Sequence, residues 1–330
     1  MNKHFHFKGW LVAALLALSA NAQATPINFA FDYLDGANEG FNDPILGAAR
    51  RAALSYAGSL WGNLLPASYG GETIHVAVLM DPLGTSGSPL ASTGNIGLYW
   101  NYSAMPSSTI YGAALANHLV GRDLNTTTDE MRVTFNSDMP FYLGNDGVTP
   151  STQYDFQSLA MHEIGHGLGF FSRIDKDNSD SVIGGMLTTT SGSTGATNQF
   201  PSIYDKFLVD ANGVQLINMS DAQRATAITS GALYWSGANG IAANGGVRPQ
   251  LYAPTSPVAG SSIVHLDPST HDLLDPNLAK GEHVAADPVT LGMLTDMGWT
   301  ITPVPEASQI WMLLSGLALL AGITKRHAKA

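Results

Sequence analysis

Residues 162–170 read HEIGHGLGF, and this stretch decides how the rest of the chain is interpreted. His162 and His166 stand four positions apart, which puts both imidazoles on one face of an α-helix, one turn apart. Both rings can therefore reach a single metal ion, and Glu163 can hydrogen-bond a metal-bound water without being a ligand itself. The stretch has the HExxH pattern of zinc hydrolases, in which one helix supplies two of the protein ligands.

The residues around the motif predict the helix that it requires. Apolar side chains recur at steps of three and four residues, at Phe156, Leu159, Ala160 and Ile164. Asp155 or Thr152 can cap the N-terminus of this helix, and Gly167 and Gly169 can end it. We therefore expect a metal-binding helix that begins just after Thr152 or Asp155 and stops at one of these glycines.

Outside the motif, the sequence predicts a sheet and two further helices. Strands are expected over residues 28–33, 73–80, 94–101 and 131–136, and helices over 44–64 and 290–297. Residues 179–198 are rich in Gly, Ser and Thr and are expected to form a surface loop. This order predicts an α+β fold in which a backing helix and the metal-binding helix pack against one twisted mixed sheet.

Both ends of the chain have the composition of targeting segments. Residues 1–24 combine a basic start, an apolar core over 11–18 and an A-x-A cleavage site, which predicts a secretory signal peptide and a mature protein that begins at Thr25. At the other end, Val304-Pro305-Glu306 precedes an apolar run and a basic end. Residues 307–324 are just long enough to cross a bilayer as an anchor.

The segment 303–330 resembles the PEP-CTERM sorting tails of exported bacterial proteins. The resemblance implies a partner, a membrane-embedded sorting protease that recognises the tail and cuts near the motif. One departure is Ala307, which stands where the family motif has proline. A plain C-terminal membrane anchor is the alternative interpretation.

The predicted mature part, residues 25–302, is long enough for one domain with an N-lobe over 25–170 and a C-lobe over 171–302 that share a cleft. The chain has 15 Lys and Arg and 26 Asp and Glu; the terminal segments contain five of the former and one of the latter, so the mature part has a net charge of −15. Such a charge disfavours nucleic acid and anionic membrane surfaces as partners. Because the chain has no cysteine, zinc must be held by histidine or carboxylate.

A catalytic zinc site usually has three protein ligands and an open position for water, so a third ligand must come from elsewhere in the chain. A downstream glutamate, which one class of zinc peptidases uses, has no candidate between Glu163 and Glu282. In the metzincin class a histidine follows Gly169 by three residues, but here that position is Ser172, whose hydroxyl is a poor zinc ligand. The remaining candidates are His265, His271 and His283.

The pattern HExxHxxGF, followed far downstream by a glycine-led segment that contains His265, resembles the leishmanolysin-type metzincins. The resemblance covers about half of the mature chain, including residues 131–136 and 290–299. It implies His265 as the third zinc ligand and a turn bearing a methionine beneath the metal. Leu274 stands where that methionine is expected, a replacement that roughly conserves volume.

The motif and the resemblance together imply an exported zinc endopeptidase of the cell envelope or extracellular space. Glu163 would take a proton from the zinc-bound water and deliver it to the leaving amine. The strand around residues 132–136 is expected to present an edge to an extended peptide or protein substrate. The alternatives are a non-catalytic surface or matrix protein on the same fold, and a zinc hydrolase with a non-peptide substrate.

Two further sets of polar residues are interpreted as structural. His75 and His118 stand apart from the segments that resemble the metzincins. Oxygen-bearing side chains alternate as in a calcium loop, but without its glycine and distal glutamate, at Asp175, Asp177, Asn178 and Asp180. A solvated turn is the preferred interpretation of this second set, and a calcium site is the alternative.

Overall fold

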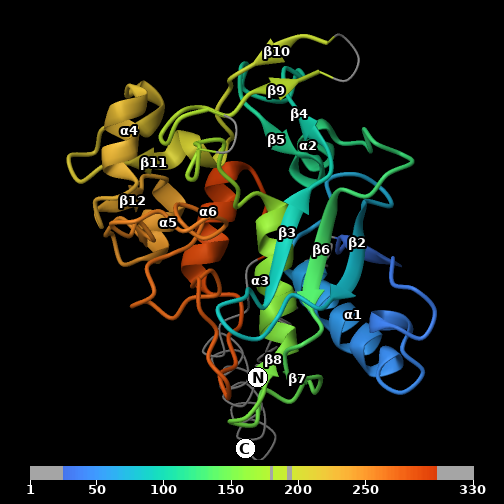
Figure 1. The fold of residues 1–330 in the computed structure, drawn as a ribbon. Helices are drawn as coiled ribbons and strands as arrows, with labels where there is room; N and C mark the ends of the chain where they lie inside the picture. The colour runs from blue at the N-terminus through green and yellow to red at the C-terminus, as the bar shows by residue number, and fades with distance from the viewer. Residues whose placement is uncertain (1–24, 179–180, 192–194, 303–330) are drawn as a thin grey trace, which may run out of the picture.

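The computed structural model describes residues 25–178, 181–191 and 195–302 (Figure 1). The predicted signal peptide and sorting tail lie outside these ranges. Within them, no helix combines the length and the apolar character that crossing a bilayer requires. The predicted α+β class is confirmed, because helices and a mixed sheet share one hydrophobic core.

A four-stranded sheet forms the N-terminal part of the fold. Its strands, in the order in which they pair, are β1 (Asn28–Tyr33), β2 (Thr73–Asp81), β6 (Met131–Asn136) and β3 (Ala91–Asn95). The first three run parallel to one another, and β3 is antiparallel to β6. This order makes β3 an edge strand and places β6 inside the sheet. The expectation that residues 132–136 present an edge to substrate is therefore wrong, because β3 and not β6 is the edge strand on this side of the sheet.

The strand predicted over 94–101 is also corrected. Residues 91–95 form β3, and the chain then turns into a separate short strand, β4 (Leu98–Tyr99), which pairs with β5 (Tyr111–Gly112). The break comes where the Gly97 carbonyl accepts a hydrogen bond from Ala113 at 3.0 Å and so leaves the ladder with β6. Because Ser92 and Thr93 are both polar, β3 lacks the apolar alternation from which a strand can be predicted.

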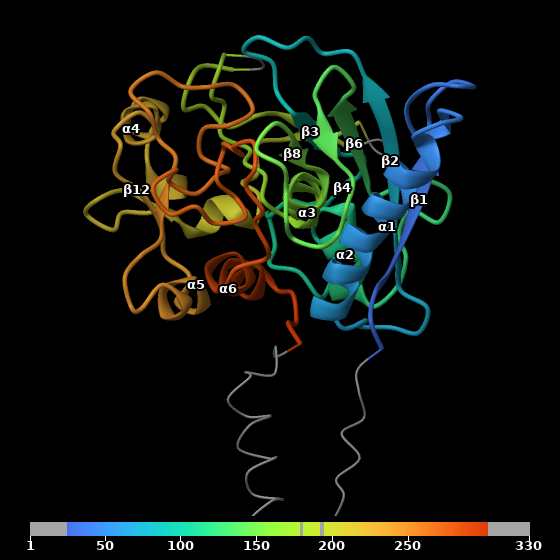
Figure 2. The same cartoon turned by 90° about the horizontal axis from the view of Figure 1, so that it is seen from below.

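Two long helices, α1 (Gly47–Leu64) and α3 (Phe156–Leu168), pack side by side against one face of this sheet (Figure 2). In the middle of α1, Gly58 allows close approach, because a Cβ there would lie only 2.8 Å from the Phe31 ring. Trp61 joins the two helices through an Nε1–H that donates to the Met161 carbonyl at 3.0 Å. The backing helix thus holds the predicted metal-binding helix in place.

Helix α1 begins three residues later than the predicted start at residue 44. The Asp43 carboxylate accepts hydrogen bonds from the amides of Ile45 and Leu46, at 2.8 and 2.7 Å, and holds this segment in a turn. The Gly47 amide donates to the Asp43 carbonyl at 2.9 Å, so this capped turn leads directly into the helix. The regular helix starts at Gly47, where a Cβ would come 2.5 Å from the Phe41 carbonyl oxygen.

Shorter elements complete the chain. The remaining helices are α2 (Ala113–Val120), α4 (Asp221–Ala227), α5 (Ala238–Ala243) and α6 (Pro288–Met297). The remaining strands are β7 (Phe141–Tyr142), β8 (Tyr154–Asp155), β9 (Thr189–Thr190), β10 (Thr197–Asn198), β11 (Leu208–Val209), β12 (Leu233–Trp235) and β13 (Gln250–Leu251). Short 3₁₀ turns lie at Gly40–Asn42, Tyr204–Phe207 and Leu216–Asn218. The expected loop over 179–198 thus contains two short strands, β9 and β10, which pair with each other antiparallel.

The C-terminal elements gather on the opposite side of α3 from the sheet, where α6 lies beside α5 (Figure 1). The predicted last helix is present as α6, with Asp287 as its N-cap and Gly298 as its C-cap. Next to it, the buried Trp299 donates its indole N–H to the Leu168 carbonyl at 2.8 Å. This bond ties the end of α6 to the end of α3.

Candidate metal centre

Helix α3 carries the HExxH residues and is fixed at both ends. Asp155 is its N-cap, and the carboxylate accepts a hydrogen bond from the Ser158 amide at 2.7 Å, so Asp155 rather than Thr152 has this role. The helix ends at Leu168, and Gly169 follows with φ 148°, a conformation open to glycine. Gly167 lies inside the last turn, pressed against Met131, and does not end the helix.

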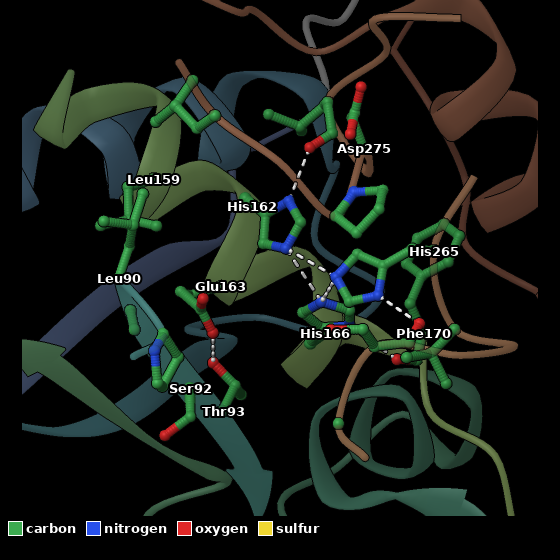
Figure 3. Close-up of a pocket in the computed structure, with 18 of the residues that line it drawn as sticks. Leu90, Ser92, Thr93, Leu159, His162, Glu163, His166, Phe170, His265 and Asp275 are labelled. Atoms are coloured by element: carbon green, nitrogen blue, oxygen red, sulfur yellow. Dashed lines mark hydrogen bonds between the residues drawn. The ribbon is translucent and has the colours of Figure 1, made fainter. Parts of the chain in front are cut away.

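The imidazoles of His162, His166 and His265 converge on one point (Figure 3). The Nε2 atoms of His162 and His166 are 3.1 Å apart, and that of His265 lies 3.1 Å from the first and 3.2 Å from the second. A shared ion with zinc–nitrogen bonds of about 2.0–2.1 Å requires ligand nitrogens at roughly this separation. The structure thus brings together the three histidines that were proposed as ligands.

Each of these histidines directs its other ring nitrogen to a backbone carbonyl. The Nδ1 atoms of His162, His166 and His265 lie 2.7, 2.8 and 2.7 Å from the carbonyl oxygens of Leu273, Phe170 and Ser261, respectively. Because a carbonyl only accepts, these contacts assign the proton to Nδ1 and leave the Nε2 lone pair free. Three lone pairs that face one another have no proton to share, so the donor set fits a bound cation.

Burial also keeps these three rings neutral, which is the form that binds a metal. Loss of hydration lowers the pKa of His162 and, with the neighbouring His162 ring, lowers that of His166 to about 3. Burial followed by the two other rings lowers the pKa of His265 as well. Three neutral imidazoles are a ligand set that suits Zn²⁺.

The segment that presents His265 is irregular but held by several hydrogen bonds. The Tyr252 amide donates to the His265 carbonyl at 2.9 Å, and the Ile263 amide donates to the Tyr252 carbonyl at 2.8 Å. Ile263 has φ 78°, which is rare for a β-branched residue, and its carbonyl accepts from the Tyr204 hydroxyl at 2.8 Å. A strained residue beside a candidate ligand is typical of a functional site.

The two alternative histidines stand outside this cluster. The side chain of His271 is 74% exposed, and its nearest acidic atoms belong to Asp275 and Glu282, at 4.0 and 3.8 Å. His283 places Nδ1 3.3 Å from the helix cap Asp155. Among the described residues, neither ring shares the point on which the three other histidines converge.

Glu163 lies beside the histidines with only 4% of its surface exposed. Its Oε2 accepts a hydrogen bond from the Thr93 hydroxyl of β3 at 2.7 Å (Figure 3). Burial raises the pKa of Glu163 to about 7, and the bond from Thr93 opposes this shift. Thr93 was missed from the sequence, because it stands 70 positions before Glu163 on a strand without an apolar pattern.

Leu274 is fully buried and packs against α3 at Gly165, where a Cβ would come 3.4 Å from its Cδ2 atom. The preceding residue, Leu273, supplies the carbonyl for His162. Leu274 itself accepts a backbone hydrogen bond from Leu266 at 2.9 Å, one residue after His265. The segment in which a methionine turn was expected therefore supports both the helix and the third histidine, with leucine as its packing residue.

Ser172, which replaces the histidine of the common metzincin pattern, points elsewhere. Its hydroxyl donates to the buried Asp205 at 2.6 Å. The Asp205 carboxylate also accepts bonds from the amides of Arg173 and Ser202, each at 2.8 Å. This arrangement fixes the chain just beyond α3 and leaves the metal centre to His265.

A cavity of about 420 Å³ opens over the candidate centre. The three histidines and Glu163 line its floor, and β3 residues including Ser92 and Thr93 line one wall. Residues 259–261, 272–273 and 275–278 contribute other walls. The volume lies within the range typical of ligand sites.

His118 and His75 lie outside the cluster of three histidines. His118 is buried, its Nδ1 lies 2.9 Å from Glu72 Oε1, and its ring lies 4.5 Å from that of Trp299, which fits a structural role. His75 lies close to Asp32 and Asp129, a second place in the described chain where metal-ligating atoms approach one another. Its structural interpretation stays a prediction.

Part of the suggested calcium loop is visible. Asp175 is buried, and its carboxylate accepts bonds from the amides of Asp177 and Ser181, at 3.1 and 2.9 Å. These bonds are those of a tight polar turn. Asp180 lies outside the described residues, so the calcium alternative is untested.

No protein-family model matches the chain, and a search of curated proteins finds no match either. The metzincin and PEP-CTERM resemblances therefore stay predictions.

Proposed function

We propose that this protein is an exported, zinc-dependent endopeptidase of the metzincin-like type, with His162, His166 and His265 as metal ligands and Glu163 as general base. The observation that carries the proposal is the convergence of three neutral, carbonyl-anchored imidazoles beside a buried carboxylate in one cavity. A purely structural zinc site is usually closed by four protein ligands and has no need of the carboxylate.

Zn²⁺ bound by the three histidines would supply a Lewis acid and would lower the pKa of water in the site. Thr93 holds Oε2 of Glu163, which fixes the direction of the carboxylate, and no other hydrogen bond to this side chain occurs among the described residues. Glu163 is therefore placed to accept a proton from the attacking water and to pass it to the leaving amine.

The position of β3 favours a peptide as the substrate. This strand is one of the two edge strands of the sheet, and its residues line the cavity beside Glu163. An extended peptide can add to such an edge through backbone hydrogen bonds, which suits cleavage within a chain.

The predicted signal peptide and sorting tail support an activity in the cell envelope or outside the cell. A sorting protease would then be a partner, and the protein would contact the membrane only through the tail.

The test is hydrolysis of an unfolded protein such as casein by the full chain, with metal content measured on the same sample. We expect activity that disappears with a chelator and returns with Zn²⁺. Glu163→Gln should retain zinc and lose roughly 10²–10⁴-fold in rate, because the amide cannot accept the proton. His271→Ala, an exposed histidine outside the centre, is the matched control.

Two outcomes would count against the proposal. Glu163→Gln with the wild-type rate would exclude the general-base role. A zinc-loaded wild-type chain that cleaves no peptide bond would favour the non-catalytic surface protein or the hydrolase of a non-peptide substrate.

A further inference from the structure

We infer that the cavity contains a carboxylate-binding subsite in which Lys176 is the cation, so that the preferred substrate of the proposed peptidase carries a carboxylate near the bond that is cut. The inference rests on the proposed function for the identity of the substrate as a peptide. The position and surroundings of Lys176 support the binding site independently of that identity.

Lys176 lines the same cavity as the three histidines, and it is the one Lys or Arg among the lining residues. The chain reaches it from the end of α3 through Phe170, Phe171 and Ser172, which also line the cavity. After burial and the neighbouring histidine, the charge of Lys176 is a further cause of the lowered pKa of His166 and His265. The ammonium group therefore lies close to the candidate metal centre.

The ammonium group of Lys176 has no ion pair within 4.0 Å and no hydrogen bond in the part of the chain that the structure describes. The acidic groups around it have other partners. Asp205 accepts from the Ser172 hydroxyl and from two backbone amides. Asp175 accepts from the amides of Asp177 and Ser181.

The nearby acidic groups favour the charged form of Lys176, but none of them forms an ion pair with its ammonium group. Burial lowers the pKa of Lys176, and the charge of Asp205, followed by those of Asp177 and Asp175, opposes that shift. A half-buried ammonium group is poorly hydrated, so a carboxylate that reaches it gains more than it would at an open surface. A neutral ligand would leave the cation unpaired, and this is how a polar site discriminates between close analogues.

Two sources of carboxylate have this chemistry. One is the side chain of Asp or Glu at a fixed position relative to the cleaved bond. The other is the C-terminal carboxylate of a short substrate, which would make the protein prefer bonds near a chain end. The two sources differ in whether amidation of the C-terminus removes the preference.

The experiment uses the full chain, loaded with Zn²⁺, and sets of hexapeptides that carry Glu or Gln at each position in turn, each as free acid and as C-terminal amide. Cleavage is followed by mass spectrometry. Binding of the same peptides to Glu163→Gln is measured by calorimetry, which does not depend on turnover. Lys176→Met, Lys176→Arg and the control Lys280→Met, which removes an exposed lysine outside the cavity, are compared in both assays.

We expect the wild type and Lys280→Met to prefer one carboxylate-bearing set by about tenfold or more in both assays, the amount that one charge-assisted hydrogen bond gives. In Lys176→Met this ratio should fall to about one, and Lys176→Arg should restore part of it. An equal response to Glu and Gln, and to acid and amide, would overturn the inference even if every peptide is cleaved. Binding with the carboxylate preference but without cleavage would instead contradict the proposed function and leave the subsite standing.

Discussion

The two regions that supply the candidate metal ligands are built in different ways. Helix α3 contributes His162 and His166 from consecutive turns, so the helical period alone sets their spacing. His265 comes from an irregular segment, which is held by hydrogen bonds to Tyr252, Leu274 and Tyr204 and contains a residue with positive φ. A regular element thus gives precision through its geometry, whereas a loop needs many separate contacts to reach the same precision.

The largest effect is expected from removing one ligand of each kind. His166→Ala and His265→Ala should both lose stoichiometric zinc and detectable peptidase activity, because a site with two ligands holds the ion far more weakly. Zinc content by atomic emission and casein cleavage are the measurements. If His265→Ala keeps its zinc while His166→Ala loses it, the loop histidine is not a ligand and the two regions are not equivalent parts of one site.

Substitutions of Leu274 measure how far the segment that carries His265 depends on packing against α3. Leu274→Ala should lower the free energy of unfolding by about 2–5 kcal/mol, because it leaves a cavity against α3. Leu274→Met, the residue expected from the resemblance, should cost less than about 1.5 kcal/mol. Denaturant unfolding followed by tryptophan fluorescence measures both. Equal stability of the two variants would show that the segment is not held by this contact.

Thr93 connects the sheet to Glu163 of the candidate centre. Thr93→Val keeps the shape but removes the hydroxyl that orients Glu163, so the rate should fall by roughly 10–100-fold, as for other residues that orient a metal site. Zinc content should not change, and Thr93→Ser should recover most of the rate. Loss of zinc together with the rate would mean that Thr93 supports the whole centre rather than the carboxylate.

The smallest effect is expected at the helix cap. Asp155→Ala removes the acceptor for the Ser158 amide and should lower the free energy of unfolding by about 0.5–2 kcal/mol. Zinc content at saturating metal should be unchanged, since residues 162–166 lie beyond the first turn. A thermal melt with and without added zinc separates these outcomes. A large loss of zinc would show that the helix end, and not only its period, sets the ligand geometry.

The same contrast explains what could be predicted from the sequence. His162, Glu163 and His166 follow from a local period, the strand β2 follows from its apolar run over residues 76–80, and β6 follows from its alternating apolar residues. β3 could not be located, since its residues are polar and small and the strand is defined by pairing with β6. Thr93, and the carbonyls of Phe170, Ser261 and Leu273, could not be identified because backbone groups and long-range contacts leave no local pattern. The placement of His265 came from a family resemblance and not from any period.

The candidate ligands lie far apart along the chain, and this separation affects the conformational freedom of the unfolded state. His166 and His265 are 99 positions apart and meet at one point, in a protein without a single cysteine. The proposed ion would therefore act as a cross-link that closes a long loop, and such a link restricts the unfolded chain much as a disulfide does. Under the proposed export, the ion would take the place that disulfides have in other exported proteins, as a reversible link between helix α3 and the C-terminal elements.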